Sequence, residues 1–332
     1  MTDPRVPTAA WLRADQTDLV RRVIADAGFE LIAAGGDGGH ELAAHAGART
    51  ASDLRALVAS TDASLVLLGD PGPFADGARR DDFKTLLAAA QAGITIASLE
   101  PIPPLSLHLT DPAWRSASDV ARERVVFTPL VRRGAAFRRA QDLLESFGPI
   151  DTVAIQTLGR GAEGSLGARL TGACDLLIRL LGMPLAVHAI HTPGPDDPPA
   201  PETLRGFRGH LAATFRFAEG QSASLFASDR AATWSRSLTL IGPGGRIVAD
   251  DETVEWYDAA GLHVDSMTAR HRETDDLAAS VIADDLRAVM GNAPRTAPVD
   301  LGSVLATAHA GLLSARTGHA EQPEKIRRMG KG

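Results

Sequence analysis

Three side chains stand where the sequence pattern favours acid–base chemistry. Glu100 ends the apolar stretch "ITIASLE" (94–100), Asp175 lies in the strongly apolar stretch "ACDLLIRLLG" (173–182), and His188 lies in "LAVHAIHT" (185–192). A carboxylate in an apolar setting can act as a general base, and an imidazole can carry a proton near neutral pH. Residues of these types can move protons at Glu100, Asp175 and His188, and we predict no metal site.

The alternatives for these groups stay open at this point. We expect His188 and His191 to share one face of a strand, from which they could reach a cleft, although ordinary strand histidines are the commoner case. Cys174, the sole cysteine, precedes Asp175 in the same apolar stretch. It is expected to be a buried, unreactive thiol.

The elements that must position these residues alternate in the first third of the chain. Strand patterns occur at 6–12, 29–35, 63–70 and 94–100, and helix patterns at 18–28, 40–47, 52–60 and 81–93. The stretch 63–70 is a continuous apolar run, as expected for a strand buried on both faces. This order predicts a doubly wound parallel sheet with right-handed crossovers.

The pattern changes near residue 120. Helix patterns at 134–148 and 173–182 are interleaved with a strand at 150–158, and strands at hairpin spacing follow from 185 to 265. Two helices, "DDLAASVIADDLRAVMG" and "SVLATAHAGLLSARTG", follow near the end. We predict an α/β protein with a first domain at 1–120 and an α+β second domain at 121–332, built on a large, mainly antiparallel sheet.

A dinucleotide site needs a glycine-rich turn after the first strand and an acidic residue at the end of the second. Here the first turn is "LRADQTDLV" (12–20), which contains no glycine, and the second strand ends in "AAGGDGG" (33–39). Arg13 could meet a phosphate, and Asp37 could serve as the ribose acid with a one-residue shift. The plainer alternatives are that Asp15 or Thr17 caps a helix and that Asp37 is a turn residue.

Composition limits the function classes. The net charge of −7 argues against binding to nucleic acid. A single cysteine allows no internal disulfide. The start "MTDPRVPTAAWLRAD" has no apolar signal-peptide core, and no run approaches the roughly 18 apolar residues of a membrane span. We expect a cytoplasmic protein with no membrane or nucleic-acid partner.

The sequence resembles the Gfo/Idh/MocA family of nicotinamide-dependent sugar and polyol oxidoreductases over nearly its whole length. "DASLVLLGDP" (62–71) is similar to the family's strand ending in Thr-Pro, "LLAAAQAGITIASLEP" (86–101) to its helix and strand ending in Glu-Lys-Pro, and "GSLGARLTGACDLLIRLLGMP" (164–184) to its helix with a His-x-x-Asp pair. The resemblance implies a Rossmann-like first domain and NAD or NADP as cofactor. It also adds Asp70 and Pro71 to the cofactor-binding candidates. Because Glu100 and Asp175 match positions of the family's active site, the resemblance makes Glu100, Asp175 and His188 the catalytic candidates.

The chain departs from the family pattern at its chemical positions. Glu100 falls on the family's lysine and Gly172 on its histidine, while the glycine-rich loop is replaced by residues 12–20. A glutamate reverses the field that the lysine would supply to a developing oxyanion. We therefore expect weak or no NAD(P) binding.

Three functions stay open in consequence. The first, which we favour, is a catalytically degenerate subunit that binds a ligand or a partner. The second is an atypical NAD(P)-dependent oxidoreductase of a sugar, polyol or related cyclic substrate, and the third is a redox-free lyase or hydratase with Glu100 as base.

Partners are also predicted from the resemblance. The family uses the open face of its C-terminal sheet as an oligomer interface, and the apolar strands "LAATFRF" and "SASLFAS" could supply one here. We expect a homo-oligomer, or a hetero-oligomer with a family paralogue, and a small sugar-like ligand.

Overall fold

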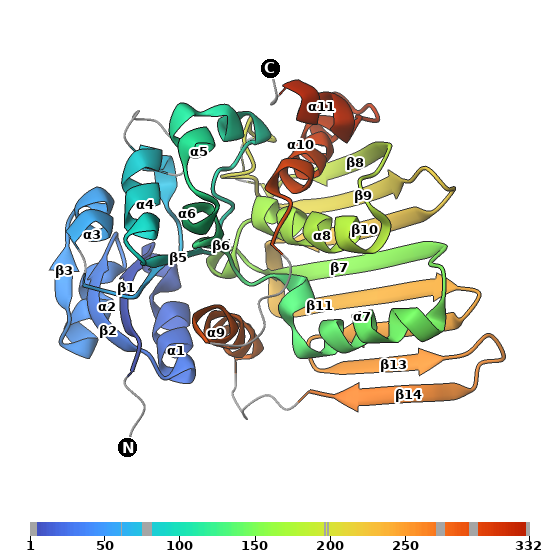
Figure 1. Cartoon of the computed structure of the whole chain (residues 1–332), viewed down its shortest axis with the longest axis horizontal. Coiled ribbons are helices and arrows are strands. Elements are labelled where there is room, and N and C mark those ends of the chain that lie inside the picture. Colours follow the sequence, from blue (N-terminus) through green and yellow to red (C-terminus); the bar gives the residue numbers. More distant parts are fainter. Residues whose placement is uncertain are drawn as a thin grey trace. The chain divides into compact units, whose positions relative to one another are not determined.

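The computed structural model describes residues 5–60, 62–74, 82–195, 197, 199–269, 276–291 and 298–329. The chain divides into two compact units (Figure 1). Unit 1 comprises residues 1–129 and 276–298, and unit 2 comprises residues 130–275 and 299–332. The segment 276–298, which we predicted in the second domain, therefore belongs to the first unit.

Unit 1 is built on a six-stranded parallel sheet with the order β3-β2-β1-β4-β5-β6. Its strands are β1 (Pro7–Trp11), β2 (Glu30–Gly35), β3 (Arg49–Ala51), β4 (Leu65–Leu68), β5 (Thr95–Ser98) and β6 (Val125–Phe127). The apolar strands β4 and β5 are buried along their whole length. The doubly wound parallel sheet predicted from the sequence is confirmed.

The helices of unit 1 follow the predicted alternation. They are α1 (Thr17–Ala27), α2 (Gly39–Ala46), α3 (Leu54–Ser60), α4 (Asp82–Gln91), α5 (Pro112–Ser116), α6 (Asp119–Glu123) and α9 (Leu277–Met290), with short 3₁₀ turns η1 (Ala14–Gln16), η2 (Gly72–Phe74) and η3 (Ser106–Thr110). Helix α9 packs against α1. Two bonds fix it in unit 1, because Arg287 donates to the Asp26 carbonyl and Thr128 Oγ1 donates to Asp285 Oδ2 at 2.6 Å.

Unit 2 is built on an eight-stranded, mainly antiparallel sheet with the order β14-β13-β12-β11-β7-β10-β9-β8. Its strands are β7 (Thr152–Arg160), β8 (Ala186–Thr192), β9 (His210–Arg216), β10 (Ser222–Ser228), β11 (Arg230–Gly242), β12 (Gly245–Asp250), β13 (Thr253–Tyr257) and β14 (His263–Thr268). Among the described ladders of this second sheet, only the β7–β10 pair is parallel. The predicted antiparallel sheet is confirmed.

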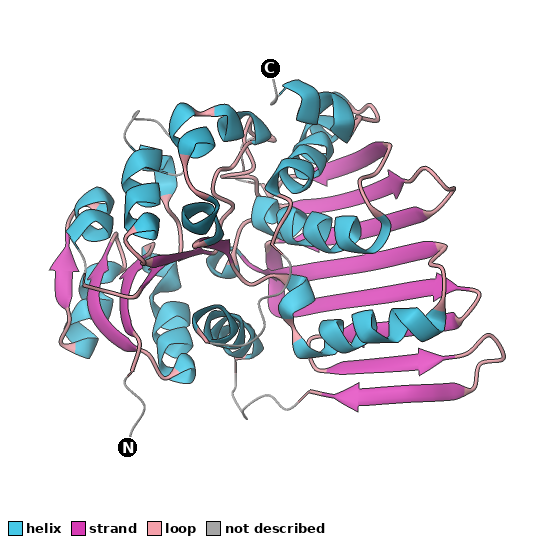
Figure 2. Ribbon diagram, in the orientation of Figure 1, coloured by secondary structure: helices cyan, strands magenta, loops and turns pink. Residues whose placement is uncertain are grey.

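Helices cover one face of this second sheet. They are α7 (Ala135–Phe147), α8 (Leu166–Leu181), α10 (Leu301–Thr317) and α11 (Pro323–Met329), with 3₁₀ turns η4 (Val131–Arg133) and η5 (Gly161–Glu163). Figure 2 shows α7, α8 and α10 over the same face. Strand residues alternate accordingly, as Leu211, Ala213 and Phe215 of β9 are buried while their neighbours face outward. Across the part of the chain that the structure describes, no helix combines the length and apolar character needed to cross a membrane.

The glycines after β2 let two loops of unit 1 touch. Gly36 has a φ of +82°, and a Cβ placed there would lie 2.3 Å from the Leu12 carbonyl oxygen. The Gly38 N–H donates to that same oxygen at 3.2 Å, and a Cβ on Gly38 would lie 2.5 Å from the Arg13 carbonyl oxygen. The β2–α2 loop therefore packs directly on the glycine-free turn after β1.

We predict that Gly36→Ala lowers the free energy of unfolding by about 3 kcal/mol or more, because it combines left-handed strain with a backbone clash. Gly47→Ala is the matched control: Gly47 also has a positive φ, of +68°, but a Cβ added there would have no neighbour within 4 Å. That variant should lose only about 1–2 kcal/mol. Urea unfolding of both proteins measures the difference, and equal losses would refute the close packing.

Candidate functional site

The predicted cofactor residues lie at the carboxyl ends of the parallel strands of unit 1. Arg13 follows β1, Asp37 follows β2, Asp70 follows β4, and Glu100 follows β5. The strand order reverses between β1 and β4. Ligands of open α/β sheets bind at such a switch point, beyond the carboxyl ends of the strands. Arg13 and Asp70 flank that point directly.

An ion pair joins the two sides of the switch point. Arg13 Nη1 donates to Asp70 Oδ2 at 3.0 Å, and Arg13 Nε donates to Asp15 Oδ1 at 2.9 Å. Asp70 Oδ1 in turn accepts the Gly72 N–H at 2.9 Å. Burial lowers the pKa of the Arg13 guanidinium, but its bonds to Asp15 and Asp70 outweigh burial and raise that pKa. The arginine is thus a fixed cation with two carboxylates of its own chain.

Gln16 is one of the side chains expected to crowd the glycine-free turn, but its contact with the end of β4 was not predicted from the sequence. Its side chain is fully buried, and its Oε1 accepts the Arg13 backbone N–H at 3.1 Å. A Cβ on Gly69 would lie 2.4 Å from that same oxygen, so the amide lies against the backbone that leads from β4 to Asp70. A glutamine three residues after a helix-capping position is a recognisable signal, and here it ties the β1 turn to the end of β4.

The other two cofactor candidates differ in exposure. Asp37 is exposed in the turn between Gly36 and Gly38, as expected from the plainer alternative of a turn residue. Pro71 is buried next to Asp70, immediately before the η2 turn. Of the four candidates, the structure brings Arg13 and Asp70 into direct contact.

Glu100 lies two residues beyond β5 and is only 2% exposed. Its backbone N–H donates to Ser98 Oγ at 3.1 Å, while the neighbouring Leu99 N–H donates to the Leu68 carbonyl at 2.9 Å. The end of β5 is therefore held against the end of β4, and the acidic side chain is removed from bulk solvent.

Asp175 lies in unit 2, on α8, and is 5% exposed. Arg132 Nε donates to Asp175 Oδ2 at 2.6 Å, and the arginine is equally buried. Burial raises the pKa of the Asp175 carboxyl, and the positive charge of Arg132 opposes that shift. Gly172, one turn earlier on the same helix, is also buried. The carboxylate is thus held by a cation of its own unit.

We predicted that His188 and His191 share one face of a strand, and that prediction is wrong. His188 is exposed on the face of the sheet opposite the helices, whereas its neighbours Val187 and Ala189 are buried beneath them. His191 points to the other face, where its Nε2 lies 2.7 Å from the Arg208 carbonyl oxygen. A strand alternates with a period of two, so residues three apart cannot share a face. His188 and Asp175 consequently lie on opposite sides of one sheet.

The sole cysteine of the chain lies within α8. Cys174 is fully buried, and burial raises the pKa of its thiol, as expected for an unreactive cysteine. Within the same described part of the chain, no group of three or more His, Cys, Asp or Glu side chains is placed to hold a metal ion.

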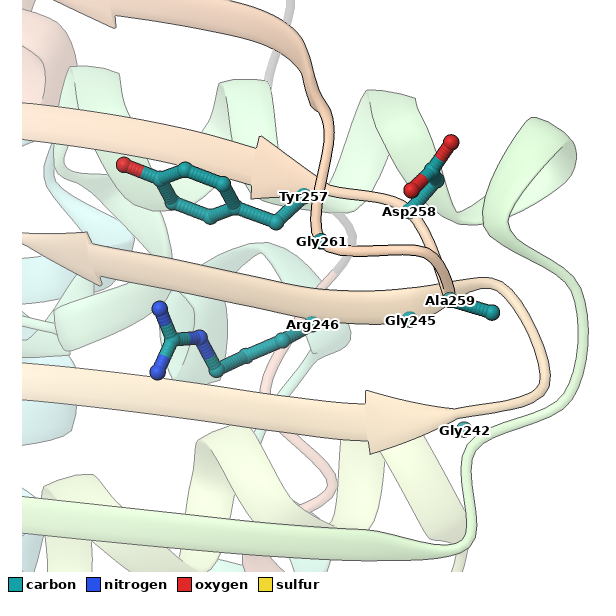
Figure 3. Close-up of a pocket in the computed structure, with 7 residues that line it drawn as sticks. All are labelled: Gly242, Gly245, Arg246, Tyr257, Asp258, Ala259 and Gly261. Carbon is teal, nitrogen blue, oxygen red and sulfur yellow. The ribbon is translucent and has the colours of Figure 1, made fainter.

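A surface depression of about 560 Å³ lies between the β11–β12 and β13–β14 turns (Figure 3). The Arg246 guanidinium lies 5.2 Å from the centroid of the Tyr257 ring beside it, and Tyr257 donates to Glu255 Oε2 at 2.8 Å. This depression contains none of the predicted site residues.

Solved structures similar to this chain are dehydrogenases of the Gfo/Idh/MocA type. A myo-inositol dehydrogenase from Corynebacterium glutamicum has 15% identity and a TM-score of 0.64, with 96% of this chain and 99% of that chain covered. GenD2 from gentamicin A biosynthesis, solved with NAD, has 18% identity, a TM-score of 0.67 and 97% coverage of both chains. A levoglucosan dehydrogenase, solved with NADH and levoglucosan, has 15% identity, a TM-score of 0.69 and coverage of 96% and 99%.

These likenesses confirm the resemblance inferred from the sequence at the level of fold. No family model matches the chain, and no curated protein matches it. The fold is therefore that of nicotinamide-dependent dehydrogenases, and the activity must be argued from the site.

We predict that Arg132→Met lowers the free energy of unfolding by about 3–5 kcal/mol, because it leaves the Asp175 carboxylate buried without its cation. Replacing both partners, as Arg132→Met with Asp175→Leu, should recover most of that loss. Arg21→Met is the control, since Arg21 pairs with Asp18 in solvent and its loss should cost within about 0.5 kcal/mol. Chemical denaturation measures all three, and an additive double variant would contradict the ion pair.

Proposed function

We propose that this chain is a catalytically degenerate protein of the dehydrogenase fold that acts as a ligand-binding or partner subunit. The observation that carries the proposal is the Arg13–Asp70 ion pair across the switch point, with the buried Gln16 side chain beside it. A pyrophosphate at that point would compete with two carboxylates for the same guanidinium. It would also meet the carboxylate of Asp70 itself.

The charges at the carboxyl ends of the parallel strands support the same proposal. The residues that follow β1, β2, β4 and β5 include one arginine, Arg13, and four carboxylates, Asp15, Asp37, Asp70 and Glu100. A dinucleotide site instead presents backbone N–H groups and a helix N-terminus to the phosphates. Here the Arg13 N–H already donates to Gln16 Oε1. Weak or no binding of NAD or NADP follows.

The residue at position 100 further supports a catalytically degenerate protein. Glu100 holds a carboxylate where the resemblance implies a lysine, and a negative group cannot stabilise negative charge developing on a substrate oxygen. The similar structures were solved with sugar-related ligands or named for them, levoglucosan and myo-inositol among them. For this chain a small sugar-like ligand is part of the proposal.

One observation favours a second function. Glu100 is 2% exposed, and a carboxylate removed from bulk solvent can act as a general base. A redox-free lyase or hydratase with Glu100 as base is therefore the second candidate. Glu100→Gln separates the two functions: loss of a general base lowers turnover by about 10²–10⁴-fold. The degenerate subunit has no turnover to lose and keeps its ligand affinity.

We predict that Glu100→Lys combined with Gly172→His does not produce hydride transfer. The two changes restore the family's lysine and histidine, but Arg13, Asp70 and Gln16 remain at the switch point. NADH formation from polyols, followed by absorbance, measures the outcome. A control variant that adds Arg13→Gly and Gln16→Ala tests whether this turn is the barrier. Clear NADH formation by the double variant alone would overturn the proposal.

Association is the second part of the proposal. The uncovered face of the second sheet carries Phe226 and Ile190, exposed by 45% and 63%, and Ala212 lies between them in register. Small neutral residues fill the neighbouring positions of this face, namely Ala154, Thr214, Ser222 and Ser224. Arg216 and His188 lie on the same face beside this patch. The patch itself is made of small or apolar uncharged residues, and such a surface suits packing against a second sheet, of another copy or of a family paralogue.

We predict that Phe226→Lys weakens this association by tenfold or more, because it places a charge in the centre of the interface. Leu262→Lys is the matched control, since Leu262 is 66% exposed in the β13–β14 turn, away from that face. Light scattering over a concentration series measures both variants. A wild-type protein that stays monomeric, with no relative co-purifying, would refute the interface.

A further inference from the structure

Thr157 of β7 and Arg236 of β11, on neighbouring strands of unit 2, each carry one buried polar atom without a partner among the described residues. Thr157 of β7 and Arg236 of β11 are directly opposite in the antiparallel ladder, and their side chains are 2% and 3% exposed. Within the described part of the chain, Thr157 Oγ1 and Arg236 Nη1 have no hydrogen-bond partner. A buried donor or acceptor left without a partner is costly, so native proteins almost always satisfy such groups.

The fixed shape of the guanidinium indicates where Nη1 points. Arg236 Nε and Nη2 donate to Asp251 Oδ1 at 2.8 and 2.5 Å. Asp251 follows β12, which lies on the other side of β11 from β7. Because the guanidinium is planar, the side that carries Nη1 is turned away from Asp251. In the strand order, β7 with Thr157 lies on the side of β11 opposite β12.

The charges determine which group fits between the two atoms. Asp251 already balances the Arg236 charge, and the rings of Phe137 and Trp234 lie 5.5 and 5.1 Å from the guanidinium carbon. An anion in this setting would bring an uncompensated charge into a buried site. Nη1 can only donate, whereas a threonine hydroxyl can donate or accept. One neutral hydroxyl oxygen satisfies both atoms.

We propose that Thr157 and Arg236 bind one neutral hydroxyl oxygen between β7 and β11. The oxygen comes either from a buried water or from one hydroxyl of a small polyhydroxylated ligand. Both sources share the same chemistry, in which the oxygen accepts from Nη1 and exchanges one hydrogen bond with Oγ1. The inference is independent of the function proposed for the switch point of unit 1, because every residue in it belongs to unit 2.

High-resolution crystal structures, without ligand and with myo-inositol as the probe, test the site directly. The expected result is an oxygen about 2.6–3.2 Å from both Thr157 Oγ1 and Arg236 Nη1. An isolated peak in both crystals identifies water as the source. Density that continues from the peak into the inositol ring identifies a ligand hydroxyl. Crystals with no oxygen between the two atoms would overturn the proposal.

A pair of variants tests it in solution. Thr157→Val removes the hydroxyl at nearly constant volume and should lower the melting temperature by about 2–4 °C, since the bound oxygen loses a partner. Thr307→Val is the control, because Thr307 is fully buried on α10 and its Oγ1 likewise has no partner among the described residues. Thr307 lies on a helix, so no second unpartnered atom lies opposite it in a strand ladder. It should not lower the melting temperature. Equal behaviour of the two variants would refute the bridging oxygen.

Discussion

The Arg13–Asp70 ion pair is the contact on which the account of this protein depends. It joins the turn after β1 to the end of β4, the two strands between which the order of the parallel sheet reverses. Gln16 closes the same junction by binding the Arg13 N–H and lying against Gly69. A fold that commonly presents backbone N–H groups to phosphate at this place here presents side chains that are already bound to each other.

Ion pairs also hold buried charged side chains in unit 2. Asp175 is bound by Arg132, and Asp251 by Arg236, with all four side chains at most 6% exposed. Buried ion pairs of this kind contribute little net stability, but each partner becomes costly to remove alone. The buried charges of Asp175 and Asp251 are thus fixed by cations of their own unit.

Much of the fold could be predicted from the sequence because buried strands and helices show a characteristic spacing of apolar residues. The continuous apolar run of β4 and the alternation of β9 and β10 specified a parallel sheet and an antiparallel sheet correctly. The strands β3 and β6, with three residues each, are too short to show a period, and we did not predict them. The position of α9 depends on contacts with α1 that are distant in sequence, and no local pattern encodes them.

The candidate site was less predictable, because its contacts join residues that are far apart in the sequence. Arg13 and Asp70 could be named as candidates, but their pairing joins residues 57 positions apart. Gln16 could be recognised as one of the side chains that crowd the glycine-free turn, but its contact with Gly69 joins residues far apart in the sequence. His188 was misplaced because residues three apart were assumed to share a strand face, which the alternation of β8 rules out.

Equilibrium binding of NADH and NADPH to the purified protein tests the central claim most directly. If the Arg13–Asp70 pair and Gln16 occupy the switch point, either cofactor at about 1 mM should cause no measurable heat of binding and no shift in melting temperature. A ligand at a hundredfold excess over its Kd would add about 2.7 kcal/mol of stability, which is readily detected. Saturable binding of either cofactor would contradict the account, and the chain would then be an oxidoreductase with an atypical nicotinamide site.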